Sequence, residues 1–112
     1  MNFKNINIQF VEFETLAEMT AEDTQLINAA IDIAKKSYSI YSNFPVGAAV
    51  RLENGEVFAG NNQENIAYPS GTCAERTVLN YVHANYPDQK ISTIAIVALH
   101  ATSETPATPC GF

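Results

Sequence analysis

Residues 46–59 read VGAAVRLENGEVFA, and this stretch determines the fold of the chain. Two apolar runs, residues 46–52 and residues 56–59, flank the dipeptide Asn54-Gly55. Asn-Gly between apolar segments is the strongest short signal for a β-hairpin, because both residues tolerate the positive φ angles of a tight turn. The sequence therefore predicts two antiparallel strands joined at Asn54 and Gly55.

Upstream of the hairpin, the sequence predicts a helix over residues 21–37. Thr20 can cap this helix, acidic residues occupy its first turn, and apolar residues recur at helical spacing. A loop rich in tyrosine and serine, residues 38–45, connects the helix to the hairpin. Apolar and polar residues alternate over residues 5–10, which predicts a half-buried strand.

Downstream of the hairpin, the sequence predicts a second helix over residues 73–86. Thr72 can cap it and Pro87 ends it. Residues 91–99 are apolar apart from Ser92 and Thr93 and are of strand length, so we expect a buried strand there. The order strand, helix, hairpin, helix, strand predicts an α/β sandwich with a mixed β-sheet.

The composition is that of one small domain. The chain has 112 residues, 46% of them hydrophobic and 16% charged, so it can form a core. We divide it into an N-terminal strand extension, residues 1–19, and one domain, residues 20–112.

The formal net charge of −6 argues against binding of nucleic acid through its phosphates, which needs a basic face. The first residues lack a signal-peptide pattern, and no apolar run approaches the roughly 20 residues of a membrane helix. We expect a cytoplasmic protein without membrane contact.

Two cysteines are the candidates for metal binding or nucleophilic chemistry. Cys73 lies at the predicted start of the second helix, where the positive end of the helix dipole favours a thiolate. Glu75 follows two residues later, and Cys110 follows Pro109. Taken alone, Cys73 also fits a buried small side chain, and Glu75 an acid in a first helical turn.

Together, the two cysteine segments match a metal-site signature. Zinc deaminases carry a His- or Cys-x-Glu segment followed by Pro-Cys-x-x-Cys. The letters CAE at residues 73–75 and PCG at residues 109–111 match this signature up to its last cysteine. The pattern places that third cysteine one residue beyond Phe112.

Further segments resemble the small, single-domain cytidine deaminases. Residues 39–49, SIYSNFPVGAA, resemble that family's Y-S-x-F-x-V-G-A segment. Residues 60–68, GNNQENIAY, resemble its G-x-N-x-E-N-A-x-Y segment, and residues 72–77, TCAERT, are similar to its C-A-E-R-T segment. Four segments in the family's order are far more specific than any one of them.

The resemblance implies a three-layer α/β sandwich with a mixed sheet, whose C-terminal part is missing from this chain. It implies a hydrolase that uses Zn²⁺ to deaminate the free nucleosides cytidine and deoxycytidine to uridine and deoxyuridine in pyrimidine salvage. It also implies a homotetramer when the protein is complete. We expect truncation to impair zinc binding and activity in the chain as given.

The resemblance also implies roles for residues around the metal. Cys73 and Cys110 match the zinc ligands, and the third ligand falls outside the chain. Glu75 matches the catalytic carboxylate that shuttles protons between water, the pyrimidine ring and departing ammonia. Arg76 matches a supporting residue that hydrogen-bonds the zinc thiolates.

Four residues match the family's substrate-binding positions. Phe44 matches the aromatic residue that lines the base pocket, and the backbone around Ala74 matches a contact to the base edge. Asn62 and Glu64 match the pair that holds the ribose hydroxyls, for which an amide and a carboxylate are suited.

On the residues alone, other interpretations stay open. Phe44 also fits the core, and Asn62 and Glu64 also fit an exposed loop. His83 and His100 are expected to be structural, because neither has metal-ligand spacing to a cysteine. Tyr38, Tyr41 and Tyr68 are expected in the core or at an interface.

Other functions also stay open for the whole chain. One alternative is a non-catalytic subunit or binding module with the deaminase fold, and another is a deaminase of a nucleoside analogue. A dithiol redox protein is disfavoured, because the chain has no Cys-x-x-Cys redox motif.

Overall fold

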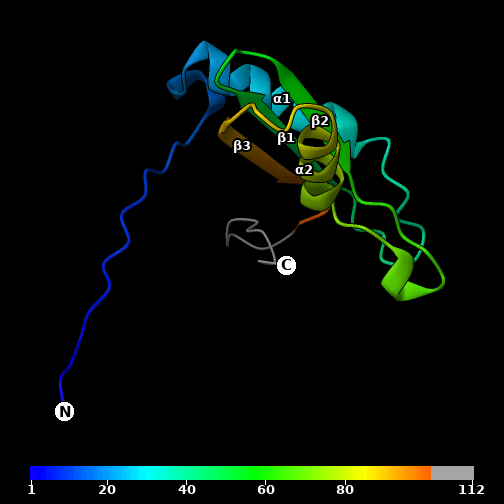
Figure 1. Ribbon diagram of the computed structural model, residues 1–112, viewed down its shortest axis with the longest axis horizontal. Coiled ribbons are helices and arrows are strands. Elements are labelled where there is room, and N and C mark those ends of the chain that lie inside the picture. Colours follow the sequence, from blue (N-terminus) through cyan, green and yellow to red (C-terminus); the bar gives the residue numbers. More distant parts are fainter. Residues whose placement is uncertain (102–112) are drawn as a thin grey trace.

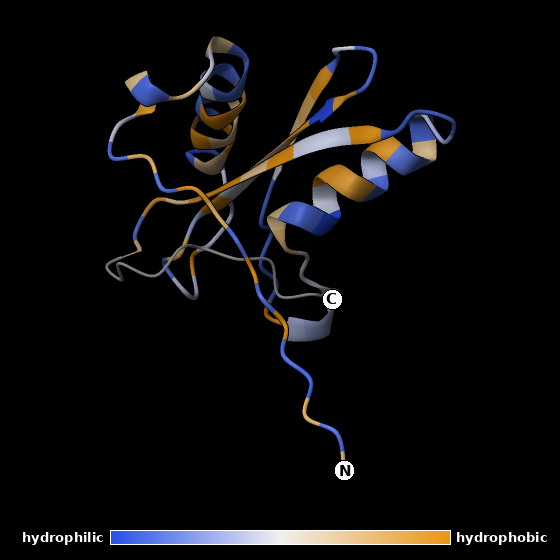
Figure 2. Cartoon of the chain, turned by 90° about the vertical axis from the view of Figure 1, so that its left-hand side faces the viewer, coloured by the Kyte–Doolittle hydropathy of each residue, from blue (hydrophilic) through white to orange (hydrophobic). Residues whose placement is uncertain are grey.

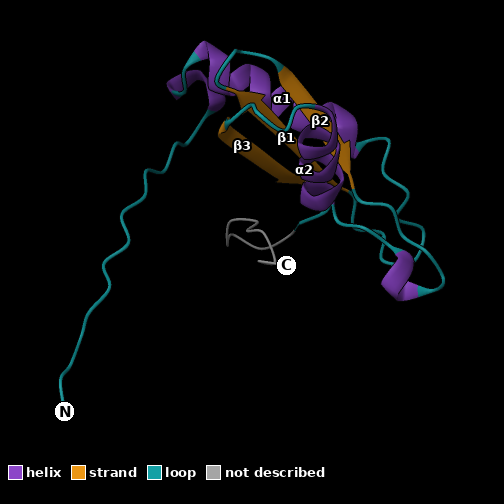
Figure 3. Cartoon of the chain, viewed as in Figure 1, coloured by secondary structure: helices purple, strands orange, loops and turns teal. Residues whose placement is uncertain are grey.

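The computed structural model describes residues 1–101 of the chain (Figure 3). Its elements, in chain order, are the 3-10 helix η1 (Leu16–Glu18), helix α1 (Ala21–Ala34), strands β1 (Val46–Leu52) and β2 (Val57–Asn61), the 3-10 helix η2 (Tyr68–Ser70), helix α2 (Ala74–Asn85) and strand β3 (Ile91–Ala98). No helix within these residues has both the length and the apolar character needed to cross a membrane.

The predicted hairpin is confirmed as β1, β2 and the turn between them. Gly55 has a φ of 92°, and its N–H donates to the carbonyl oxygen of Leu52 at 2.9 Å. Ala49 pairs with Ala59 across the two antiparallel strands. Strand β2 runs to Asn61, two residues further than expected.

Strand β1 is the centre of the sheet, whose order is β2-β1-β3 (Figure 1). Strands β2 and β3 flank α2 in sequence and run in the same direction, but β1 lies between them and pairs antiparallel with each. Among residues 1–101, parallel pairing is therefore limited to a single bridge between Tyr38 and Gln63. The parallel part of the expected mixed sheet is not among the described strands.

The two helices cover opposite faces of the sheet, which confirms the three-layer α/β fold (Figure 2). Successive side chains of β1 point to opposite faces. On one face, the buried residues of β1 and α2 form a cluster of Ala48, Val50, Leu52, Ala74, Val78 and Val82. On the other face, Ala49 packs against Leu26 and Ala30 of α1.

Two glycines allow this close packing of helices on the sheet. A Cβ atom at Gly47 of β1 would lie 2.0 Å from the carbonyl oxygen of Ala30 in α1. A Cβ atom at Gly60 of β2 would lie 2.8 Å from the main-chain nitrogen of Val78 in α2. Any larger residue at either position forces the helix away from the sheet.

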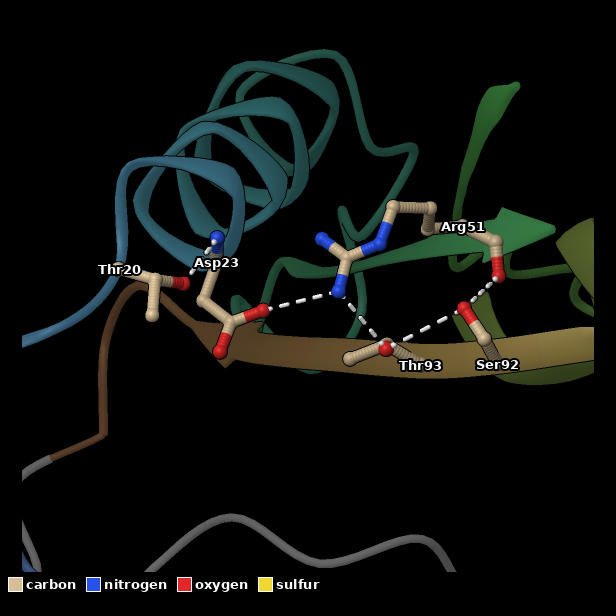
Figure 4. A network of polar contacts seen from close by, with 5 residues as sticks. All are labelled: Thr20, Asp23, Arg51, Ser92 and Thr93. Atoms are coloured by element: carbon tan, nitrogen blue, oxygen red, sulfur yellow. Dashed lines mark hydrogen bonds and ion pairs between the residues drawn. The ribbon is translucent and has the colours of Figure 1, made fainter. Parts of the chain in front are cut away.

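Helix α1 is tied to the sheet at its first turn (Figure 4). The Thr20 hydroxyl oxygen accepts a hydrogen bond from Asp23 N–H at 3.2 Å, which confirms the predicted cap. Asp23 Oδ1 forms an ion pair with Arg51 Nη2 at 3.0 Å, and the same Nη2 donates to Thr93 Oγ1 at 3.0 Å. One guanidinium therefore joins α1, β1 and β3.

The expected N-terminal strand over residues 5–10 is wrong. Residues 1–13 have no regular structure, their side chains are exposed, and the segment runs away from the body of the molecule (Figure 1). Alternating side chains specify which face of a strand is apolar, but a strand also needs a hydrogen-bonded neighbour. The division of the chain at residue 19 stays a prediction.

The expected burial of the last strand is also wrong. Strand β3 is half-exposed, and Ile91 and Ile94 are among its exposed residues. Its only partner among residues 1–101 is β1, so it lies at an edge of the described sheet. A largely apolar segment of strand length predicts a strand but does not distinguish the centre of a sheet from its edge.

Two helix boundaries differ from the predicted ones. Helix α1 ends at Ala34, three residues early, because the chain turns toward β2 and Tyr38 N–H donates to the carbonyl oxygen of Asn62 at 3.2 Å. Helix α2 begins after Cys73, which takes the cap position expected for Thr72. The Thr72 hydroxyl donates instead to the carbonyl oxygen of Cys73 at 3.4 Å.

Candidate active site

Three loops meet at one end of the sheet, where β1 begins and β2 ends (Figure 3). Gln63 lies between the other two loops and exchanges two main-chain hydrogen bonds with Thr72, each 2.9 Å long. On the other side, Glu64 N–H donates to the carbonyl oxygen of Tyr38 at 2.8 Å. The loop before β1, the loop after β2 and the residues before α2 are therefore adjacent.

The start of α2 carries three of the predicted site residues. Cys73 is half-buried at the N-cap, and its side chain accepts no capping hydrogen bond. Its carbonyl oxygen accepts from the N–H and the hydroxyl of Thr77, at 3.0 and 2.9 Å. Ala74 is fully buried, and Glu75 is half-buried in the first turn. The sulfur of Cys73 thus stands at the positive end of a helix dipole.

Asn62 connects its own loop to the loop before β1. Its Oδ1 accepts from Val46 N–H at 2.9 Å and from the Ser37 hydroxyl. Its Nδ2 donates to the carbonyl oxygen of Phe44 at 2.9 Å. The amide expected to hold ribose therefore braces the chain on both sides of Pro45. Within residues 1–101, Nδ2 donates this one hydrogen bond, and its second N–H can serve a further acceptor.

Glu64 holds the turn before Phe44. Its Oε1 accepts from the main-chain N–H groups of Tyr41 and Ser42, at 3.0 and 3.1 Å. Hydrogen bonds from the Ser42 hydroxyl, Ser42 N–H and Tyr41 N–H lower the pKa of the Glu64 carboxyl below its usual 4.5, against a smaller opposing effect of desolvation. The carboxylate is thus the form that fits this turn.

Phe44 is not a core residue, because 42% of its surface is exposed. It follows Asn43, whose φ of 53° is the only positive value at a non-glycine residue in the described part of the chain. Its main-chain N–H donates to the Ser42 hydroxyl at 3.1 Å. An exposed ring on a well-bonded loop is available to a ligand.

Two further residues are predicted for the metal site, Arg76 and Cys110. Arg76 is exposed on the first turn of α2, and Cys110 lies outside the described residues. Zinc in proteins takes sulfur, nitrogen and carboxylate ligands, usually four in number. Among residues 1–101, no three His, Cys, Asp or Glu side chains are grouped to hold a metal ion. Within that range, Cys73 offers a donor of the kind that zinc prefers.

The other aromatic and histidine positions are exposed as well. Tyr38, Tyr41 and Tyr68 are exposed, so none of them belongs to the core. His83 is exposed near the end of α2. His100 follows β3, and its Nδ1 lies 2.8 Å from the carbonyl oxygen of Asn43, next to Phe44.

Comparison with known proteins agrees with this arrangement. Residues 1–106 match the family model of the cytidine and deoxycytidylate deaminase zinc-binding region. The chain belongs to this family. It is 40% identical over 86 residues to the cytidine deaminase of Halalkalibacterium halodurans, a match that covers 77% of this chain and 62% of the relative. It is 36% identical over 87 residues to that of Sporosarcina psychrophila, covering 78% and 61%. The chain thus spans about three fifths of the length of these relatives.

Solved structures of the deaminase family share the fold. The cytidine deaminase from Burkholderia pseudomallei superposes with a TM-score of 0.69 at 39% identity, over 83% of this chain and 70% of that one. The cytidine deaminase from Mycobacterium tuberculosis superposes with a TM-score of 0.70 at 32% identity, over 82% and 72%. At these identities the likeness supports the family assignment as well as the fold.

Sequence reasoning missed three residues that build the deaminase-like loop cluster. Ser37 and Ser42 hydrogen-bond to the predicted site residues, and His100 contacts the loop from the end of β3. Ser42 stands two residues before Phe44, a spacing at which a serine hydroxyl often accepts from the main chain. For Ser37 and His100 the sequence holds no such signal, because their partners are 25 and 57 residues away.

Proposed function

We propose that the protein deaminates cytidine and deoxycytidine with water, which yields uridine or deoxyuridine and ammonia. The observation that carries the proposal is the adjacency of two segments in a chain of the deaminase family. One is the loop cluster with Phe44, Asn62 and Glu64, and the other is the start of α2 with Cys73 and Glu75. An aromatic ring, an amide and a carboxylate beside a helix N-terminus suit a small polar nucleoside.

Zinc is the cofactor in this proposal. Bound zinc acts as a Lewis acid that makes water a better nucleophile. Cys73 and Cys110 would supply thiolate ligands, and the zinc-deaminase signature includes a third cysteine. The exposed guanidinium of Arg76, in the same helical turn as Glu75, offsets excess negative charge of a thiolate-rich site.

Glu75 moves the protons in the proposed reaction. Its carboxylate takes one proton from the attacking water and delivers it to the pyrimidine ring. It then takes the second proton from the same oxygen, now bonded to the ring carbon, and delivers it to the amino group, which leaves as ammonia while the carbonyl forms. Its place in the first turn of α2, two residues after Cys73, supports this role, because both side chains start from the same end of the helix.

The nucleoside is held by the loop cluster. Phe44 packs against the base, and the main chain at Ala74 contacts the base edge. Asn62 and Glu64 hold the ribose hydroxyls with the hydrogen-bonding capacity that the loop contacts leave to them. We further propose, from the family resemblance, a homotetramer that acts in pyrimidine salvage in the cytoplasm.

The test is uridine formation from cytidine by the protein expressed to its natural stop codon, with zinc supplied. We expect turnover, and we expect Glu75→Ala to lower kcat by about 100- to 10,000-fold, the usual contribution of a general acid–base group. Glu53→Ala is the matched control, because Glu53 is an exposed carboxylate at the hairpin turn. Its kcat should equal that of the wild type.

Two outcomes would contradict the proposal. A folded, zinc-loaded protein without turnover of either nucleoside would favour a non-catalytic subunit or a deaminase of a nucleoside analogue. Equal kcat in Glu75→Ala and the wild type would remove Glu75 from the reaction.

A further inference from the structure

Every main-chain N–H group in the loop around Phe44, residues 41–46, donates a hydrogen bond. The N–H groups of residues 41–44 and 46 all donate, and residue 45 is a proline. Their acceptors are Glu64 Oε1 for Tyr41 and Ser42, the Ser39 carbonyl oxygen for Asn43, Ser42 Oγ for Phe44 and Asn62 Oδ1 for Val46. A short exposed loop with this many bonds is fixed in one conformation.

The carbonyl oxygens of Asn43, Phe44 and Pro45 in the same loop are also bonded, and two of these bonds come from the end of β3. Leu99 N–H donates to the carbonyl oxygen of Pro45 at 3.1 Å. His100 Nδ1 lies 2.8 Å from the carbonyl oxygen of Asn43. These two contacts are made to the residues directly before and directly after Phe44. The residues that follow β3 therefore hold the part of the loop that carries the Phe44 ring.

The contact at His100 defines which ring nitrogen carries a proton. A carbonyl oxygen only accepts, so Nδ1 must donate. If the imidazole were protonated at Nε2 alone, Nδ1 would also be an acceptor, and no hydrogen bond to the carbonyl oxygen could form. The residue that accepts this bond, Asn43, is in the left-handed conformation, at a φ of 53°. That conformation sets the direction in which the following residue, Phe44, leaves the turn.

We propose that His100 is a positioning residue, which holds the Asn43 carbonyl oxygen through Nδ1–H and thereby fixes the ring of Phe44 for contact with the pyrimidine base. The proposal rests on the proposed function for its substrate. It assigns no chemical step to His100, because the histidine contacts the main chain of the loop and acts through Phe44.

The first test compares variants of the zinc-loaded, full-length protein with cytidine as the substrate. We expect His100→Leu to raise KM about three- to tenfold, the effect of one hydrogen bond, with kcat within about twofold. His100→Asn keeps an N–H donor and should recover part of the loss. His83→Leu is the matched control, because His83 is exposed on α2, and it should match the wild type.

A double-mutant cycle with Phe44→Ala separates positioning from general stabilisation. If His100 acts through the Phe44 ring, His100→Leu should change KM little once the ring is removed. An undiminished effect of His100→Leu in the Phe44→Ala background would overturn the proposal. So would a His100→Leu protein with the wild-type KM.

Two measurements do not depend on turnover. ¹⁵N NMR should find the His100 ring protonated at Nδ1, with the signal identified by its loss in His100→Asn. Hydrogen exchange of the Asn43 and Phe44 amides should be faster in His100→Leu. A neutral ring protonated only at Nε2, or unchanged exchange, would overturn the positioning role even if the protein deaminates cytidine. If both expected results are found in a protein that does not turn over cytidine, the proposed substrate is refuted, but the contact between His100 and Asn43 is confirmed.

Discussion

At the scale of single residues, Glu64 shows how a site side chain also builds its loop. Its carboxylate accepts from the main chain at Tyr41 and Ser42, and the Ser42 hydroxyl in turn accepts from Phe44 N–H. Hydrogen bonds to this carboxylate from the Ser42 hydroxyl and from the main-chain N–H groups of Ser42 and Tyr41 favour its charged form, so the pKa of Glu64 is lower in the folded protein than its usual 4.5. Such a group stabilises the fold above the higher, unfolded pKa, and the contribution disappears as the pH falls through the lower, folded one.

This coupling predicts a pH-dependent difference between the wild type and Glu64→Gln. The wild type should have the higher Tm, by a constant margin, above about pH 5, and the margin should shrink as the pH falls below 4.5. Thermal unfolding between pH 7 and pH 3 measures it, with Glu53→Gln as an exposed control. A margin that stays the same over this range would show that charge at Glu64 does not hold the turn.

The sequence identifies the chemical groups of the candidate site better than it identifies their contacts. Phe44, Asn62 and Glu64 are recognised by motif, and the structure brings their loops together. That Asn62 binds the Phe44 carbonyl oxygen could not be predicted, because the contact depends on how two loops, 18 residues apart, pack after folding. The binding roles of Phe44, Asn62 and Glu64 stay predictions, as do the zinc-ligand roles of Cys73 and Cys110.

At the scale of elements, the contact between β2 and α2 depends on the absence of a side chain. A Cβ atom at Gly60 would lie 2.8 Å from Val78 N and 3.1 Å from the Thr77 Cβ. The first of these is a main-chain atom that cannot rotate away, and Val78 belongs to the buried cluster between sheet and helix. The helix that begins beside Cys73 must therefore shift as a unit if Gly60 is enlarged.

Gly60→Ala should destabilise the fold by about 1–3 kcal/mol, the usual effect of overpacking. Urea unfolding measures the change, and Ala59→Ser, at the exposed neighbouring position of β2, should stay within about 0.5 kcal/mol of the wild type. Unchanged stability in Gly60→Ala would mean that α2 can move without loss of packing. If the shift of α2 displaces Glu75, deamination should fall as well.

Local signals explain which elements could be predicted. The hairpin, both helices and the strand near residues 91–99 each have a turn residue, a cap or a periodicity within their own segment. The pairing of β1 with both neighbours and the edge position of β3 have no such signal, because they depend on long-range hydrogen bonds. The alternation over residues 5–10 misled the prediction for the same reason.

At the scale of the whole molecule, the N-terminal segment is a separate region. Residues 1–13 carry seven large apolar side chains that are each at least 47% exposed: Met1, Phe3, Ile6, Ile8, Phe10, Val11 and Phe13. None of the hydrogen bonds found within residues 1–101 involves residues 1–13. The fold of the remaining described chain therefore does not depend on this segment.

Deletion of residues 2–13 should leave the free energy of unfolding within about 0.5 kcal/mol of the wild type, as expected for exposed residues without contacts. Urea unfolding at low protein concentration measures it. A deletion protein that is clearly less stable, with a loss that grows at higher protein concentration, would show that the segment packs against a second copy. Sedimentation at the same concentrations provides the control.

The bonding of the Phe44 loop has a consequence for how substrate preference can change. The polar atoms that hold the loop belong to the main chain and to Ser42, Asn62, Glu64 and His100, and none of them belongs to the ring. The side chain at residue 44 can therefore be replaced while its support stays intact. With Phe44 against the base, as proposed, a series such as Phe44→Tyr, Phe44→Trp and Phe44→Leu offers a direct route to altered nucleobase specificity by evolution or by engineering.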